Sequence, residues 1–193
     1  MLTITIPASD GNWDEINQVF TEPTKETTIS LEHSLISISK WEEKYKKPFL
    51  GDGSEKYINK TPEELFDYIK CMTIVPKGAP PIDDSVYDNI TSENLREITD
   101  YMQDPHTATE VTYHNKKSLK KPEILTSEVI YANMTILNIP SKYERWHINR
   151  LLTLIEVTAI KSDPNPKKMS RSEILSQNKA INELRRAKHH SKG

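Results

Sequence analysis

Two proline-rich segments divide this chain and limit where helices and strands can form. The first, residues 75–82, reads VPKGAPPI, and the second, residues 163–168, reads DPNPKK. Proline has no backbone N–H and its ring clashes with the preceding helical turn, so neither a helix nor a central strand can run through these segments. We therefore expect a mostly helical body over residues 1–160 and a proline-hinged C-terminal arm over residues 161–193.

The arm is basic although the chain as a whole is slightly acidic. The chain has 26 Lys and Arg against 28 Asp and Glu, a net charge of -2. From residue 160 onward there are nine basic and three acidic residues, so this part carries +6 and the rest carries -8. This asymmetry favours an arm that binds nucleic acid, an acidic protein or the body of a neighbouring copy. A solvated tail has the same composition, so that interpretation stays open.

Hydrophobic patterns in the first half predict a small β element followed by helices. Apolar residues alternate over residues 1–7, which predicts a strand, and residues 26–31 can supply its antiparallel partner. From Leu31 the spacing becomes helical until Pro48. Thr61, followed by Pro62 and Glu64, is a capping-box signature and predicts a helix over residues 62–72, with Leu65 among its inward residues.

The second half is predicted to be helical as well. A helix with Leu95 on its inner face should begin at Thr91 or Ser92 and end before Pro105, and residues 107–114 alternate weakly like a strand. Residues 118–160 predict two helices separated at Ile139 and Pro140. The second of these should open with a capping box from Ser141 to Glu144 and contain Trp146, which we expect, with Trp41, to anchor the core.

The sequence of the arm predicts a basic amphipathic helix over residues 170–188, which begins with a third capping box from Ser170 to Glu173. Its apolar stripe is flanked by lysines and arginines, and it contains no Phe, Trp or Tyr on which bases could stack. Contact with nucleic acid would therefore be limited to phosphate electrostatics. The residues predicted to bind a partner are Lys167, Lys168, Arg171, Ile174, Ile181, Leu184, Arg185 and Arg186.

No motif for catalysis, metal binding or cofactor binding emerges from the sequence. The six histidines do not cluster along the chain, and His33 and His147 are expected to be structural residues on helices. The single cysteine, Cys71, predicts a buried thiol without a catalytic partner. We therefore expect no catalytic, cofactor or metal-binding residues, no cofactor, and a protein that is not an enzyme.

These observations predict a mainly α fold with a small N-terminal β element, an α+β class, and a hinged C-terminal helical arm. With 35% hydrophobic and 28% charged residues, only a modest core is expected. The sequence has no basic leader and no run of about 18 apolar residues, and its lone cysteine is typical of a reducing compartment. We expect a soluble intracellular protein without a membrane partner.

Three segments resemble a family of small structural and morphogenesis proteins of tailed bacteriophages. They read ISLEHSLISISKWEEKYKKPFL, LTSEVIYANMTILNIPSKYERWHINRLLTLIEV and NPKKMSRSEILSQNKAINELRRAKHHSKG. The shared features are an EHSL…SKWE stretch, a WH-x-NRLLTLI helix, a PKKMS opening and a C-terminus that closes on Lys-Gly. The three segments span residues 29–50, 125–157 and 165–193, and their motifs carry no known chemistry.

The resemblance implies a non-enzymatic role in virion assembly, with a tail assembly chaperone as the leading interpretation. Its partners would be tail or other virion proteins, such as the tape-measure protein, or other copies of the chain. It would act in the host cytoplasm during assembly. The first alternative is a structural component of the virion, in the neck, tail or capsid interior, whose arm binds neighbouring subunits. The second is a nucleic-acid-binding protein that uses the basic arm.

Overall fold

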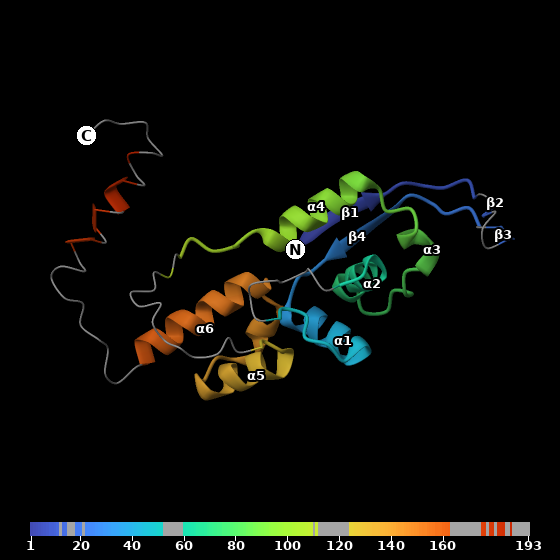
Figure 1. The fold of residues 1–193 in the computed structure, drawn as a ribbon. Coiled ribbons are helices and arrows are strands. Elements are labelled where there is room, and N and C mark those ends of the chain that lie inside the picture. Colours follow the sequence, from blue (N-terminus) through green and yellow to red (C-terminus); the bar gives the residue numbers. More distant parts are fainter. Residues whose placement is uncertain are drawn as a thin grey trace.

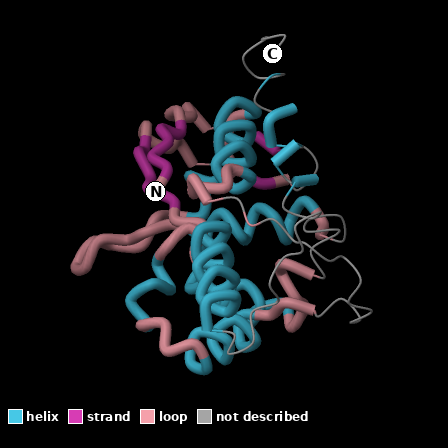
Figure 2. The backbone as a smooth tube through the Cα atoms, turned by 90° about the vertical axis from the view of Figure 1, so that its left-hand side faces the viewer, coloured by secondary structure: helices cyan, strands magenta, loops and turns pink. Residues whose placement is uncertain are grey.

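The fold is mainly α-helical with a small antiparallel β element at the N-terminus, which confirms the predicted fold class (Figure 1). The structure is a computed structural model. It describes residues 1–11, 13–14, 18–20, 22–51, 60–109, 111, 124–162, 175–176, 178–179, 181–183 and 186. In the view of Figure 2 the helices form the bulk of the molecule, and the strands are short.

The N-terminal β element is a long hairpin. Strand β1 (Leu2–Ile6) pairs antiparallel with β4 (Thr27–Leu31), as predicted. The ribbon continues outward through β2 (Trp13–Asp14) and β3 (Val19–Phe20), which pair with each other and project beyond the body (Figure 1). The inward side chains of β1 and β4 are buried in the core: Ile4, Ile6, Ile29 and Leu31.

Residues 72–74, at the end of the helix over residues 62–72, pair with the outer side of β4. The backbone N–H of Glu32 donates to the carbonyl of Met72 at 2.9 Å, and the N–H of Ile74 donates to the carbonyl of Ser30 at 2.8 Å. Leu31 is therefore the last residue of β4 and bridges to Thr73, so the prediction that a helix starts at Leu31 was wrong.

Helices α1 (Leu35–Tyr45) and α2 (Pro62–Met72) begin at hydroxyl caps. The Ser34 hydroxyl accepts from the N–H of Ser37 at 3.4 Å. In α2 the Thr61 hydroxyl accepts from the N–H of Glu64 at 3.2 Å, and the Glu64 carboxylate accepts from the N–H of Thr61 at 3.1 Å. These two bonds confirm the predicted capping box and the predicted bounds of α2.

After the proline segment 75–82, which has neither helix nor strand, come α3 (Asp84–Tyr87) and α4 (Ser92–Gln103). Helix α4 packs against β1, and the Asn94 amide donates to the carbonyl of Thr5 at 3.4 Å. The start of α4 after Thr91 is confirmed. The strand predicted over residues 107–114 is absent from residues 107–109 and 111, and its other positions lie outside the described residues.

The last part of the body contains α5 (Ser127–Ile136), a short 3₁₀ helix η1 (Ser141–Arg145) and α6 (Ile148–Ser162). The predicted break near Pro140 is confirmed, but the predicted capping box from Ser141 to Glu144 was wrong. Glu144 instead accepts from the Tyr131 hydroxyl at 3.0 Å. Burial raises the pKa of the Tyr131 hydroxyl to about 12, with a smaller contribution from its hydrogen bond to this carboxylate.

No helix among the described residues is both long and apolar enough to cross a membrane.

The core lies between the hairpin and α1, α2, α4, α5 and the first turns of α6. Trp41 is 1% exposed, and its indole N–H donates to the carbonyl of Glu64 at 2.8 Å, which confirms it as a core anchor. Trp146 is only half-buried. Its ring contacts that of Tyr143 in a tilted arrangement and lies under the Arg150 guanidinium, whose central carbon is 4.0 Å from the ring centroid.

A buried carboxylate connects three segments of this core. Glu42 of α1 is 7% exposed. One of its oxygens accepts from the N–H of Phe49 and the other from the N–H of Ser127, both at 2.7 Å. The side chain therefore fixes the turn after α1 and the first turn of α5, where the orphan N–H groups of a helix need an acceptor.

Removing the arm should leave the body folded. Among the described residues, the buried hydrophobic side chains lie between Ile4 and Leu151, so deletion of residues 167–193 takes away none of these. We expect the truncated chain to keep the helical circular dichroism of the full chain and to melt within a few degrees of it. Loss of the cooperative melting transition after truncation would show that the arm belongs to the core.

Candidate protein-docking groove

An apolar groove opens between α2 and α4. Its volume is about 230 Å³, below the roughly 300–1,000 Å³ of typical small-molecule sites, and it can receive one or two aliphatic side chains. Apart from Thr99, Gln103 and the Tyr68 hydroxyl, its lining side chains are apolar. The lining residues are Leu65, Tyr68, Ile69, Leu95, Ile98, Thr99, Met102 and Gln103.

The groove exists because the apolar faces of two amphipathic helices do not pack fully against each other. Leu65 and Ile69 lie one turn apart on α2, and Leu95 and Met102 lie two turns apart on α4, so each helix presents an apolar face. Leu95 is 37% exposed. The prediction that it points into the core was wrong, because nothing among the described residues covers this end of the apolar face.

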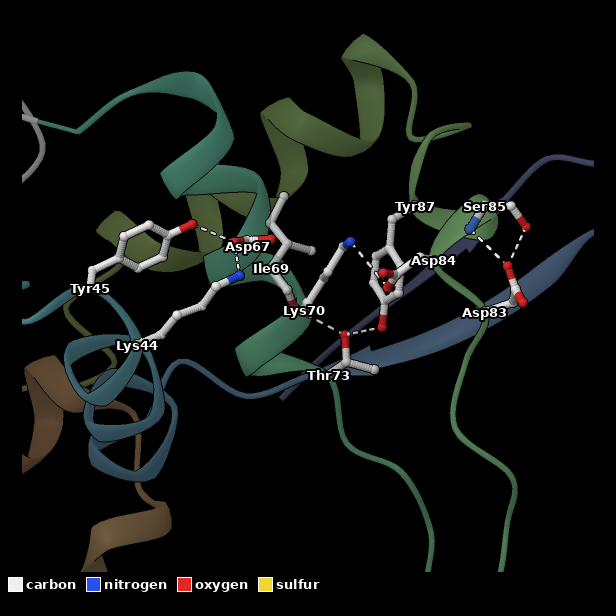
Figure 3. Close-up of polar contacts among 10 residues, drawn as sticks. All are labelled: Lys44, Tyr45, Asp67, Ile69, Lys70, Thr73, Asp83, Asp84, Ser85 and Tyr87. Carbon is white, nitrogen blue, oxygen red and sulfur yellow. Dashed lines mark hydrogen bonds and ion pairs between the residues drawn. The ribbon is translucent and has the colours of Figure 1, made fainter. Parts of the chain in front are cut away.

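Polar contacts hold α2 in place from its other sides (Figure 3). The Asp67 carboxylate accepts from the Lys44 ammonium and the Tyr45 hydroxyl, both on α1. Burial opposes ionisation of Asp67, but these hydrogen bonds outweigh it and keep its pKa below the ordinary value.

The C-terminal end of α2 forms polar contacts with α3. Lys70 forms an ion pair with Asp84 at 3.1 Å. The Tyr87 hydroxyl donates to the Thr73 hydroxyl at 3.0 Å, and Thr73 donates in turn to the carbonyl of Ile69 at 3.0 Å. One wall of the groove is therefore fixed before any partner binds (Figure 3).

Behind the groove lies a cluster of histidine rings that the sequence did not predict. The His33 ring is hydrogen-bonded to the Tyr68 hydroxyl at 2.6 Å. The His147 ring centroid lies 5.0 Å from that of His33 and 4.0 Å from that of His106. The prediction that His33 and His147 lie on helices was wrong. His33 follows β4, His106 follows α4, and His147 precedes α6.

The hydrogen bonds of His147 fix it as a neutral imidazole. Its Nε2–H donates to the carbonyl of Tyr101 at 3.0 Å, and its Nδ1 accepts from the N–H of Asn149 at 3.3 Å. Burial, followed by the nearby His106, lowers the pKa of His147 to about 4. Within the described part of the chain, no group of three or more His, Cys, Asp or Glu side chains is arranged to hold a metal ion.

Cys71 lies on α2 and is half-buried. Burial raises the pKa of its thiol, which disfavours the thiolate form that a nucleophile needs.

Two large aromatic side chains are exposed at the tip of the hairpin. Trp13 is 53% exposed and Phe20 is 60% exposed. The two residues are opposite each other in the register of β2 and β3. No role was predicted for either residue, although an aromatic residue on each side of a short connection is the signal that could have identified them.

The arm is described only in part. Of the predicted partner-binding residues, Ile181 and Arg186 fall within described positions. Both are helical, with Ile181 half-buried and Arg186 exposed. Leu175, also helical, is 62% exposed. The other predicted residues and the segment 163–168 lie outside the described residues, namely Lys167, Lys168, Arg171, Ile174, Leu184 and Arg185.

Comparison with family models, with curated proteins and with solved structures found no match to this chain.

Proposed function

We propose that this protein is a non-enzymatic bacteriophage morphogenesis protein that acts as a tail assembly chaperone through protein–protein contacts. The observation that carries the proposal is the exposure of large apolar side chains on its two ends, Trp13 and Phe20 at the hairpin tip and Leu175 on the arm. The resemblance of three long segments to tailed-phage assembly proteins supports the same role.

The physical requirement for such a chaperone is an accessible apolar surface. A chaperone covers aggregation-prone surface on its partner, so its own apolar contacts must be open before the partner arrives. Burying one large apolar side chain contributes about 1.5–3 kcal/mol, so a few exposed residues suffice for reversible binding. The partner we propose is a tail protein of the tape-measure type, held in the host cytoplasm while the tail assembles.

Nucleic acid is a less favoured partner. Lys179 and Arg186 are exposed on helical positions of the arm and could contact phosphates. Phosphate binding, however, gives no role to the exposed aromatic side chains of Trp13 and Phe20, whereas a protein partner would bury them.

Quantitative mass spectrometry of purified phage particles and infected-cell lysate tests the proposal. We expect the protein to be abundant in lysate and absent from particles, because a chaperone is released when the tail is complete. A constant copy number in particles would replace the chaperone role by that of a virion component.

A capture experiment tests the contact itself. Tagged full-length protein should capture a tail protein from infected cells, and Trp13→Ser should weaken that capture. Val75→Ser is the matched control, since Val75 is 42% exposed but lies in the proline segment away from the hairpin tip.

A further inference from the structure

The groove between α2 and α4 has the chemistry of a receptor for a branched aliphatic side chain. Leu65, Ile69, Leu95, Ile98 and Met102 supply an apolar lining, and the volume of about 230 Å³ matches side chains better than a substrate. The fixed position of α2 means that this wall of the groove is already in place when an apolar residue binds.

The solvent-facing side of α4, turned away from the groove lining, is acidic. It exposes Glu93, Glu97 and Asp100 against a single basic residue, Arg96. An occupant of the groove is therefore favoured if its apolar residues are accompanied by positive charge, both for the rate of encounter and for the register of binding.

The arm of this same chain has both properties. Ile181 is helical and half-buried, and Lys179 and Arg186 are helical and exposed on either side of it in sequence. Ile174 and Leu184 extend the apolar spacing along the sequence, and the part of the chain from residue 160 onward carries +6.

The described arm residues do not lie on the groove of their own chain. In Figure 1 their helical pieces lie to the left of the body, apart from α2 and α4. An arm that does not occupy the groove of its own chain is available to another molecule, and the partner that is always present at equal concentration is a second copy.

We propose that Ile181 of one copy inserts into the α2–α4 groove of a second copy, with basic residues of the arm facing the acidic side of α4. The inference deepens the proposed function by naming a receptor and an occupant for the arm. Because donor and receptor are different surfaces, the contact is head-to-tail and can link more than two copies.

Sedimentation equilibrium of the full chain tests this contact. The wild type should self-associate in a concentration-dependent manner. Ile181→Asp on the arm and Leu95→Asp on the groove should each raise the dissociation constant at least about tenfold, because a charge replaces a buried aliphatic contact. Matched controls place the same charge beside each site, Asn182→Asp on the arm and Ser92→Asp at the start of α4, where both residues are exposed. The controls should associate like the wild type.

A mixing experiment identifies the occupant. Ile181→Asp retains an intact groove and Leu95→Asp retains an intact arm, so an equimolar mixture should form a one-to-one heterodimer although each variant alone is monomeric. A mixture that stays monomeric although the wild type associates would overturn the proposal, because the arm and the groove would then not be each other's partners. A wild-type chain that is monomeric at every concentration, or oligomers indifferent to both substitutions, would also overturn it. Thermal melting by circular dichroism confirms that each variant is folded.

The result of these association experiments is independent of the mass-spectrometry test of the proposed function. If the protein captures a tail protein but does not self-associate, the chaperone role stands and the groove proposal fails. If it self-associates through the arm but is a fixed component of particles, the groove proposal stands and the chaperone role fails.

Discussion

Glu42→Ala should lower the free energy of unfolding by about 3 kcal/mol. The two oxygens of this buried carboxylate accept from the N–H groups of Phe49 and Ser127. Alanine leaves both donors buried without these acceptors, and each such loss costs about 1–3 kcal/mol. The first turn of α5 should loosen first, because Ser127 is its first residue.

Urea denaturation followed by tryptophan fluorescence measures this effect, since Trp41 is buried one residue away. Glu43→Ala is the matched control, because Glu43 has the same charge on the same helix but is exposed. It should change stability by less than about 0.5 kcal/mol. Glu42→Gln keeps one acceptor oxygen and should give an intermediate loss. Equal losses for the alanine variants at positions 42 and 43 would mean that the buried carboxylate does not join these segments.

Acid should destabilise the protein through His147. Its pKa is about 4 in the folded protein, mainly because of burial and secondarily because of His106. The N-terminal amino group also lowers this pKa, whereas the Tyr101 carbonyl and Asp104 raise it. An unfolded histidine titrates near 6.5, so between these values the unfolded chain binds a proton that the folded chain does not. The stabilisation is complete above about pH 6.5 and declines by up to about 3 kcal/mol as the pH falls to about 4.

His147→Gln separates this effect from the titration of carboxylates. The glutamine amide can still donate to the carbonyl of Tyr101, but it carries no titratable group. The free energy of unfolding should therefore fall more between pH 7 and pH 4.5 in the wild type than in the variant. Parallel declines in the two proteins would assign the acid sensitivity to other groups.

Local signals explain which helices were predictable. The start of α2 follows from Thr61 and Glu64, whose capping bonds lie within a single turn. The similar pattern from Ser141 to Glu144 failed, because the Glu144 carboxylate is occupied by Tyr131 and the chain then continues to a tertiary contact. That contact is the bond from the N–H of Ile148 to the carbonyl of His33.

The candidate site depends on distances between helices, which periodicity does not encode. The pattern placed Leu65 and Leu95 on apolar faces, but it could not show that these faces leave a groove between them. The histidine cluster joins residues 33, 106 and 147, which share no local pattern. The predicted helical state of the arm agrees with the described positions around Ile181, whereas its predicted cap at Ser170 lies outside the described residues.

The segment after α2 pairs with β4, and this pairing limits the association of molecules through strand edges. Unpaired strand edges present rows of N–H and C=O groups that template sheet growth between molecules. Here the bonds from Ile74 to Ser30 and from Glu32 to Met72 occupy the outer edge of β4 near the body. The inner half of the hairpin is thereby closed on that side to strand addition. The protein can thus present Trp13 and Phe20 at the tip while the end of β4 nearest the body is closed to strand addition on this side.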